Sequence, residues 1–128
     1  MVAIPIDTKK STVLSELYGK APYFAILDME VGYFNVVKNE EIGKGPKSAE
    51  FLKKHGVNST IYYHMGEGVY KSFEKNSMSV YTSKHNHYTI DEIYHLMLDK
   101  KLTQVNSSNS HELLDPGESG SCKCGCNE

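Results

Sequence analysis

The sequence predicts an α/β protein built on one mixed, five-stranded sheet, and two features of residues 1–103 support this. Short runs rich in β-branched and aromatic residues recur along this part of the chain, with glycine and proline between them. No long helical stretch separates the first three runs, whereas segments with helical spacing flank the later ones. A hairpin followed by two strand–helix units is typical of a mixed sheet flanked by helices.

The first strand is expected at residues 2–6, where VAIPI is a nearly continuous apolar run suited to burial on both faces. Residues 11–22 suggest a short helix or turn that ends in glycine and proline. The next two runs, residues 23–30 and 33–39, are rich in aromatic and β-branched side chains. They flank Val31-Gly32, so we expect them to pair as a hairpin.

The first long helix is expected to begin at Gly45-Pro46 and to end at Gly56. Proline suits the first helical position, and glycine is preferred directly after the last one. Residues 59–63 then have the pattern of the fourth strand. Residues 66–76 predict a second helix, with apolar side chains four positions apart.

The fifth strand and the last helix complete the predicted sheet. Residues 78–82 have the pattern of a strand, and Thr89 with Glu92 three positions later forms a capping box that starts a helix. Because crossovers between parallel strands are right-handed, strands one, four and five should be parallel. The expected order across the sheet is 3-2-1-4-5, with strand 2 antiparallel.

This strand order also predicts where a ligand binds. In open sheets of this kind, ligands lie beyond the carboxyl ends of the parallel strands, where the strand order reverses. Three loops should line that crevice: residues 7–10, 64–68 and 83–87.

Composition limits the possible partners and the location. All 14 basic residues are lysine and the net charge is −2, so we expect no nucleic-acid partner. The N-terminal apolar run is too short for a signal peptide, and no stretch is long enough to span a bilayer. We therefore expect a cytoplasmic protein without membrane association, monomeric or weakly homodimeric.

The apolar periodicity stops at Thr103, which predicts a domain at residues 1–103 and a flexible tail at 104–128. This tail holds every cysteine of the chain, at positions Cys122, Cys124 and Cys126. In a reducing compartment such closely spaced thiols favour a soft metal ion, Zn, Cu or Fe, although an incidental cysteine tail is the alternative. Tetrahedral zinc would need a fourth ligand, from His111, from His64 or from a second chain.

Two of the crevice loops contain metal-ligand side chains. His64 and Met65 supply an imidazole and a thioether, and Gly66 and Gly68 allow close approach to the start of a helix. The alternative is that this loop simply makes a turn. His85 and His87 form an H-x-H pair whose imidazoles share one side if the chain is extended, or else two chance histidines of a solvated loop.

An enzyme would need further groups. Asp7, at the end of the first strand, stands where a metal-binding carboxylate of a nuclease would lie, but the loop after the fourth strand offers His64 and Met65 instead of a second acid. We therefore expect Asp7 to serve in a turn and the protein not to be an enzyme.

Several motifs, in their order along residues 1–103, resemble one known family. They are VAIPID, SELYGKAPYFAILDME, FLKKHGV, MSVY and TIDEIYHLMLDKKL, and the stretch from Ser15 to Phe24 contributes most of the likeness. The chain is similar to the dinitrogenase iron-molybdenum cofactor biosynthesis family, which includes the NifX and NafY carriers, the C-terminal domain of NifB and the orange-protein relatives.

The resemblance implies a ribonuclease H-like fold and the binding or carriage of a metal–sulfur cluster, Fe–S or Mo-containing, between donor and acceptor proteins. Such a cluster is an anion with exchangeable sites on its metals, which imidazole and thioether ligands suit and lysines balance. The cluster would then be held by His64, Met65, Gly66, Gly68, His85 and His87, and Lys9 and Lys10 would also contribute. Two alternatives stay open: a soft-metal delivery protein acting through its cysteine tail, and a divergent ribonuclease H-like hydrolase using Asp7.

Overall fold

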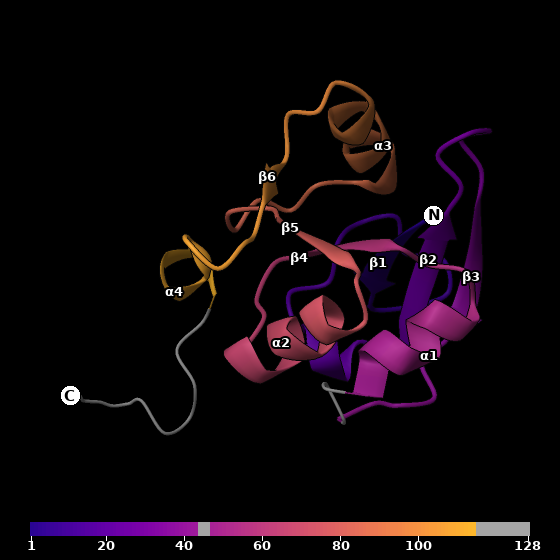
Figure 1. The fold of residues 1–128 in the computed structure, drawn as a ribbon. Helices are drawn as coiled ribbons and strands as arrows, with labels where there is room; N and C mark the ends of the chain where they lie inside the picture. The colour runs from indigo at the N-terminus through magenta and orange to yellow at the C-terminus, as the bar shows by residue number, and fades with distance from the viewer. Residues whose placement is uncertain (44–46, 115–128) are drawn as a thin grey trace.

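The computed structural model describes residues 1–43 and 47–114, without the side chain of His111, and contains one six-stranded mixed sheet (Figure 1). The order across the sheet is β3-β2-β1-β4-β5-β6. The strands are β1 (Val2–Ile6), β2 (Tyr23–Leu27), β3 (Phe34–Lys38), β4 (Ser59–Tyr62), β5 (Ser79–Thr82) and β6 (Thr103–Gln104).

The strand pairing confirms the predicted fold class and the predicted order of the first five strands. β1 pairs in parallel with β4, and β4 in parallel with β5. β2 is antiparallel to both of its neighbours, and the hairpin that joins it to β3 turns through Gly32 at a φ of 79°. The sixth strand, antiparallel to β5, was not predicted.

Three helices flank the sheet: α1 (Ser48–Lys54), α2 (Glu67–Lys75) and α3 (Ile90–Leu98). The predicted start of α1 at Gly45-Pro46 lies outside the described residues. A short 3-10 helix, η1 (Tyr18–Lys20), occupies part of the predicted turn region. The capping box that was expected to begin α3 is present, because Thr89 and Glu92 exchange side-chain-to-backbone hydrogen bonds of 3.1 and 3.0 Å.

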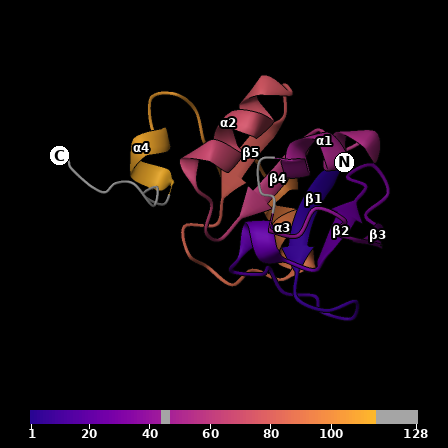
Figure 2. The same cartoon turned by 90° about the horizontal axis from the view of Figure 1, so that it is seen from below.

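The two faces of the sheet form separate apolar layers. α1 and α2 lie side by side over one face (Figure 2), where Phe51, Leu52 and Phe73 pack against Phe24 and Tyr62. Of the helices that the structure describes, α3 packs over the other face, through Ile90 and Ile93. Within the first layer the hydroxyl of Tyr18 hydrogen-bonds to Thr60 Oγ1 at 2.6 Å, and burial raises the pKa of this phenol far above its usual range.

The expectation that regular structure ends at Thr103 is wrong for residues 103–114. β6 pairs with β5, and a further helix, α4 (Ser110–Leu113), follows it. Val105 is 3% exposed, and Tyr62 Oη donates a hydrogen bond of 2.8 Å to the carbonyl oxygen of Leu113. Isolated apolar residues among polar ones produce no periodicity, so only their burial in the tertiary structure reveals this segment.

The three cysteines, and with them the predicted metal-binding tail, lie outside the described residues. Among the helices of residues 1–43 and 47–114, none combines the length and the apolar character that crossing a bilayer requires.

Candidate functional site

The carboxyl ends of β1, β4 and β5 meet at one edge of the sheet because the three strands are parallel neighbours. The loops that follow them contain the histidines predicted to line the crevice. A fourth segment joins this edge: Leu17 forms an isolated parallel bridge with His64. Residues from the turn before η1 therefore lie beside the loop after β4.

The structure brings His64, His85 and His87 together around the ring of Tyr63. The ring centroid of Tyr63 lies 4.8 Å from that of His64, 5.3 Å from that of His85 and 4.6 Å from that of His87. The rings of His64 and His85 are themselves 4.8 Å apart. Two loops separated along the sequence thus present three imidazoles on one aromatic platform, and we call these four residues the histidine cluster.

Glu16 contacts the histidine cluster and was not predicted. Its Oε2 lies 2.8 Å from Nε2 of His87, and both side chains are about half exposed, at 54% and 53%. The contact orients the His87 ring. When the imidazole is protonated, the hydrogen bond becomes a charge-assisted one. Tyr63 was also missed, since an aromatic residue at the end of a strand has no sequence pattern that separates it from the core.

The loop after β5 holds His85 in an unusual backbone conformation. Lys84 and His85 have φ angles of 53° and 64°, in the left-handed region that non-glycine residues seldom adopt. The amide of Lys84 donates to Thr82 Oγ1 at 3.0 Å, and the side chain of Asn86 donates to the carbonyl of Ser83 at 2.8 Å. These hydrogen bonds offset the backbone strain and direct the loop toward Tyr63.

Asp7 serves the turn after β1, as expected from the sequence. Its Oδ1 accepts a hydrogen bond of 2.7 Å from Ser15 Oγ, and the same Oγ accepts from the amide of Leu17 at 3.3 Å. This chain of hydrogen bonds holds the Leu17 segment against His64. Lys9 and Lys10 are exposed in the same loop, where their ammonium groups are free to move toward an anion.

Met65 does not face the crevice, which corrects its prediction as a ligand. Its side chain is 2% exposed and belongs to the apolar layer under α1 and α2. The physical reason is that the chain turns from β4 into α2 at this point and needs an apolar side chain to cover that layer. The thioether is therefore a core group.

Gly66 and Gly68 lie where α2 begins. Gly66 is the N-cap residue with a φ of −80°, and no side chain caps the first turn of the helix. A Cβ atom added at either glycine would meet nothing within 4 Å. Neither packing nor backbone strain requires these glycines, but their lack of side chains leaves the amides at the start of α2 accessible, as an anion-binding helix terminus requires.

The histidine cluster is not a preformed ion site. Within the part of the chain that the structure describes, no three or more His, Cys, Asp or Glu side chains converge as they would around a metal ion. The arrangement instead offers several nitrogen donors side by side on a shallow surface. Such a surface suits a ligand with more than one metal centre better than a single ion.

The fold and this edge of the sheet define a small α/β protein with three histidines gathered at the carboxyl ends of its parallel strands. The sequence model of the dinitrogenase iron-molybdenum cofactor family matches residues 1–100, so the chain belongs to this family. The resemblance found in the sequence motifs is thereby confirmed. No relative was found among curated protein sequences.

Two solved structures share the fold. The apo form of the orange protein from Desulfovibrio gigas has 16% sequence identity and a TM-score of 0.71, with 81% of this chain and 91% of that chain covered. A putative NifB protein from Thermotoga has 28% identity and a TM-score of 0.66, with 80% and 90% covered.

Proposed function

We propose that this protein binds a metal–sulfur cluster, Fe–S or Mo-containing, at the histidine cluster and transfers it between a donor and an acceptor protein without catalysing a reaction. The family to which the chain belongs supports a role connected with the iron-molybdenum cofactor. The observation that carries the proposal is the gathering of three imidazoles around Tyr63 at the carboxyl edge of the parallel strands.

Each group at this edge has a function toward an anionic cluster. The imidazoles of His64 and His85, 4.8 Å apart between ring centroids, are close enough to bind neighbouring metal atoms of one cluster. The uncapped amides at the start of α2 and the ammonium groups of Lys9 and Lys10 would balance its negative charge. His87, held by Glu16, would support the cluster from the side.

Shallow, half-exposed ligands suit a carrier. Tyr63 and His64 are partly buried, and His85 and His87 are exposed, so an acceptor protein can reach a cluster bound there. Imidazoles bound at exchangeable sites on the metals of a cluster can be replaced, one at a time, by ligands of the acceptor protein. The cysteine tail is proposed to assist by capturing a soft metal and by completing this site with thiolates.

The hydrolase alternative receives no support from the described residues. Oδ1 of Asp7 accepts a hydrogen bond from Ser15 in a turn, and Ser15 is 2% exposed. The soft-metal alternative differs from the main proposal in its ligands, because it binds a metal ion through the cysteines of the tail instead of a cluster through the imidazoles around Tyr63.

Reconstitution under anaerobic conditions tests the proposal. The reduced protein is mixed with tetrathiomolybdate and ferrous iron, and binding is followed by sulfide-to-metal charge-transfer absorption and by amide chemical shifts. We expect shifts at residues 7–10, 64–68 and 83–87 together. Shifts confined to residues 28–33 at the hairpin tip, or no binding at all, would contradict the placement. Binding that needs only the cysteines would favour the soft-metal alternative.

A further inference from the structure

One face of the sheet is covered less completely than the other. Two helices, α1 and α2, pack over one apolar layer, whereas α3, nine residues long, packs over the other. Six strands span roughly 24 Å from edge to edge, and one helix covers only about 10 Å of that width. Apolar side chains consequently stay half-exposed on both sides of α3: Tyr23, Val36, Tyr81 and Leu102.

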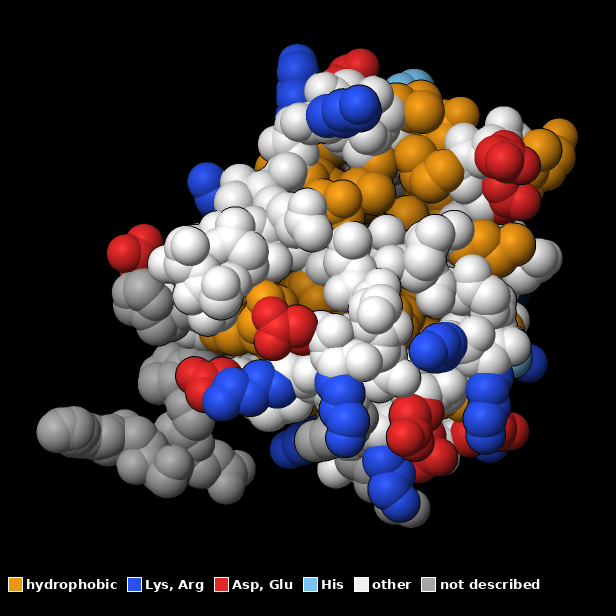
Figure 3. All heavy atoms as spheres, in the orientation of Figure 1, with side chains coloured by type: hydrophobic (Ala, Val, Ile, Leu, Met, Phe, Trp, Pro, Cys, Tyr) orange, Lys and Arg blue, Asp and Glu red, His pale blue; other side chains and the backbone are white. Residues whose placement is uncertain are grey.

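The hairpin tip adds exposed apolar residues to this face. Tyr33 is 78% exposed and Val31 is 61% exposed, and Leu98 at the end of α3 is 51% exposed. The tip is held against α3, since a Cβ atom on Gly32 would lie 3.3 Å from the ring of Tyr94. Figure 3 shows hydrophobic side chains gathered over α3 and beside it, and a further group at the hairpin tip on the right.

We call this surface the α3 face and define it by eight residues: Val31, Tyr33, Phe34, Tyr81, Tyr94, Met97, Leu98 and Leu102. Contiguous apolar surfaces of this kind on small proteins mark interaction sites.

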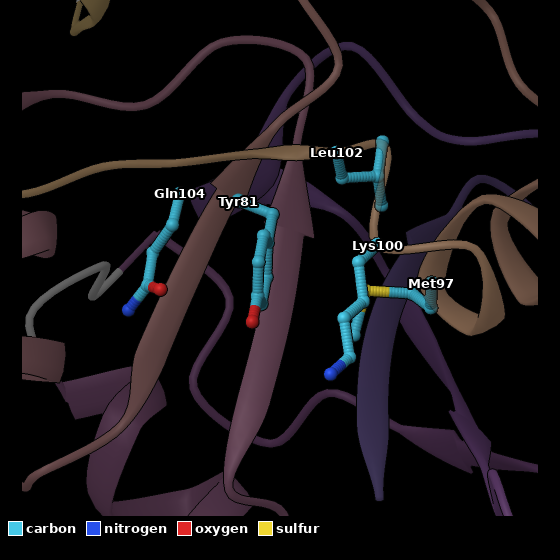
Figure 4. A pocket seen from close by; sticks show the side chains of 5 residues that line it. All are labelled: Tyr81, Met97, Lys100, Leu102 and Gln104. Atoms are coloured by element: carbon cyan, nitrogen blue, oxygen red, sulfur yellow. The ribbon is translucent and has the colours of Figure 1, made fainter.

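A pocket opens in the α3 face on the side away from the hairpin. It has a volume of about 370 Å³ and is lined by Tyr81, Met97, Lys100, Leu102 and Gln104. In Figure 4 the Tyr81 hydroxyl, the Lys100 amino group and the Gln104 amide all point the same way. The pocket therefore has apolar walls and a polar rim, which suits the ring and hydroxyl of a tyrosine side chain.

Opposite charges flank the α3 face. Lys100 and Lys101 follow α3 beside the pocket, and Asp28 and Glu30 lie in the hairpin turn. Figure 3 shows lysines at the upper left of the apolar area and acidic side chains beside the hairpin tip on the right. Within the described residues, Glu30 and both lysines take part in no ion pair. Each end of the face thus lacks the charge that the other end presents.

We propose that the occupant of the α3 face is a second copy of this chain in a two-fold symmetric dimer. A two-fold axis in the plane of contact, perpendicular to the line from hairpin to pocket, brings the hairpin tip of each copy over the pocket of the other. Tyr33 then enters the pocket as an anchor, and Glu30 meets Lys100 and Lys101 of the second copy. One contact, used twice, covers both exposed regions.

The hairpin tip of a copy lies far from that copy's own histidine cluster. Val2 pairs with Leu27 and with Ser59, so the hairpin tip lies at the amino ends of the parallel strands. The histidine cluster lies at their carboxyl ends, on the opposite edge of the sheet. The inference is independent of the proposed function, because self-association can be measured on the protein without any cluster.

Sedimentation velocity of the full chain over a concentration series tests the dimer. A reducing agent is present throughout, so that disulfides of the cysteine tail do not link copies. We expect a reversible dimer, and Tyr33→Ser should raise its dissociation constant by roughly tenfold or more, as loss of a buried aromatic anchor does. Ile42→Ser is the matched control, because Ile42 is 47% exposed and lies outside the α3 face. The circular dichroism spectra of both variants should equal that of the parent chain.

Charge reversal identifies the partner surface. Glu30→Lys alone and Lys101→Glu alone should each weaken the dimer, and the double variant should restore it, since the exchanged charges meet again across the axis. A chain that stays monomeric at about 1 mM overturns the proposal. So does a dimer that Tyr33→Ser and Ile42→Ser affect equally, or one that the double variant fails to restore.

Discussion

At the scale of single residues, Tyr63 and its three imidazole neighbours set the properties of the candidate site. Tyr63 is a half-buried platform, since it contacts His64, His85 and His87 while its own side chain packs against the layer under α3. Glu16 holds one imidazole from outside the platform. The histidines differ in how firmly they are held: His64 is partly buried, and His85 is exposed.

Replacement of single histidines should therefore have graded effects. We expect His64→Ala to weaken cluster binding by about tenfold or more, as loss of one ligand or its support does, and His85→Ala to weaken it less. His95→Ala is the matched control, because His95 is an exposed histidine of α3 whose Nε2 lies 3.6 Å from Oδ1 of Asp91. Titration followed by charge-transfer absorption measures the affinities. Equal affinity in His64→Ala and the parent chain would reduce His64 to a turn residue.

At the scale of elements, a helix cap and two short elements near Leu114 add to the stability of the domain. Among residues 1–43 and 47–114, α3 is the one helix over its face of the sheet, so its stability affects the whole apolar layer beneath it. Its capping box satisfies amides that a helix start leaves without partners. The segment that contains β6 and α4 extends the fold in a similar way, since Val105 and Leu114, which follow these two elements, are buried in the layer under α1 and α2.

Loss of the cap of α3 should be measurable. We expect Thr89→Ala to lower the free energy of unfolding by about 1 kcal/mol, because Thr89 Oγ1 no longer accepts the Glu92 amide. Urea unfolding followed by circular dichroism measures the change. Thr8→Ala, at an exposed position in the loop after β1, should change it much less. Equal effects in the two variants would contradict a special contribution of the cap.

Truncation should reveal the contribution of residues 105–114. We expect a chain that ends at Gln104 to be less stable than one that ends at Leu114 by about 3 kcal/mol or more. The shorter chain loses the burial of Val105 and Leu114 and the hydrogen bond from Tyr62 to Leu113. Thermal and urea unfolding of the two chains compare them directly. Equal stability would mean that this segment packs without stabilising the domain.

At the scale of the whole molecule, the histidine cluster and the hairpin tip lie at opposite edges of the sheet. The carboxyl edge of the parallel strands presents the histidine cluster, and the amino edge presents the hairpin tip of the α3 face. The cysteines, at the end of the chain, can serve the first edge if the chain between them and Leu114 is long enough to reach it.

Metal binding by the tail tests that last role. We expect a chain ending at Leu114 to lose at least one tightly bound soft metal ion per chain, zinc or Cu(I), while its fold is retained. The full chain with Ser at Cys122, Cys124 and Cys126 should behave in the same way, which separates the thiols from the rest of the tail. Competition with a chelator measures the affinities. If all three proteins bind zinc and Cu(I) equally, the tail has no metal function.

The sequence alone determined the architecture of the first five strands and the three main helices. The features that predicted these elements are local and follow short-range rules. They are the apolar run of residues 2–6, the aromatic and β-branched hairpin, and the Thr89–Glu92 capping box. The right-handed crossover rule then converted those elements into a strand order. The crevice and two of its three loops followed from that order, so His64, His85 and His87 were named correctly as neighbours.

Only the tertiary structure decided which side chains face that crevice and where the fold ends. Met65 is buried because the chain turns into α2 there, and Glu16 approaches His87 across 71 positions of sequence. Val105 and Leu114, directly after β6 and α4, are buried in a segment that no periodicity marked. The physical reason is the same in each case: side-chain direction at a turn and contacts between distant segments depend on packing of the whole chain, which local spacing does not encode.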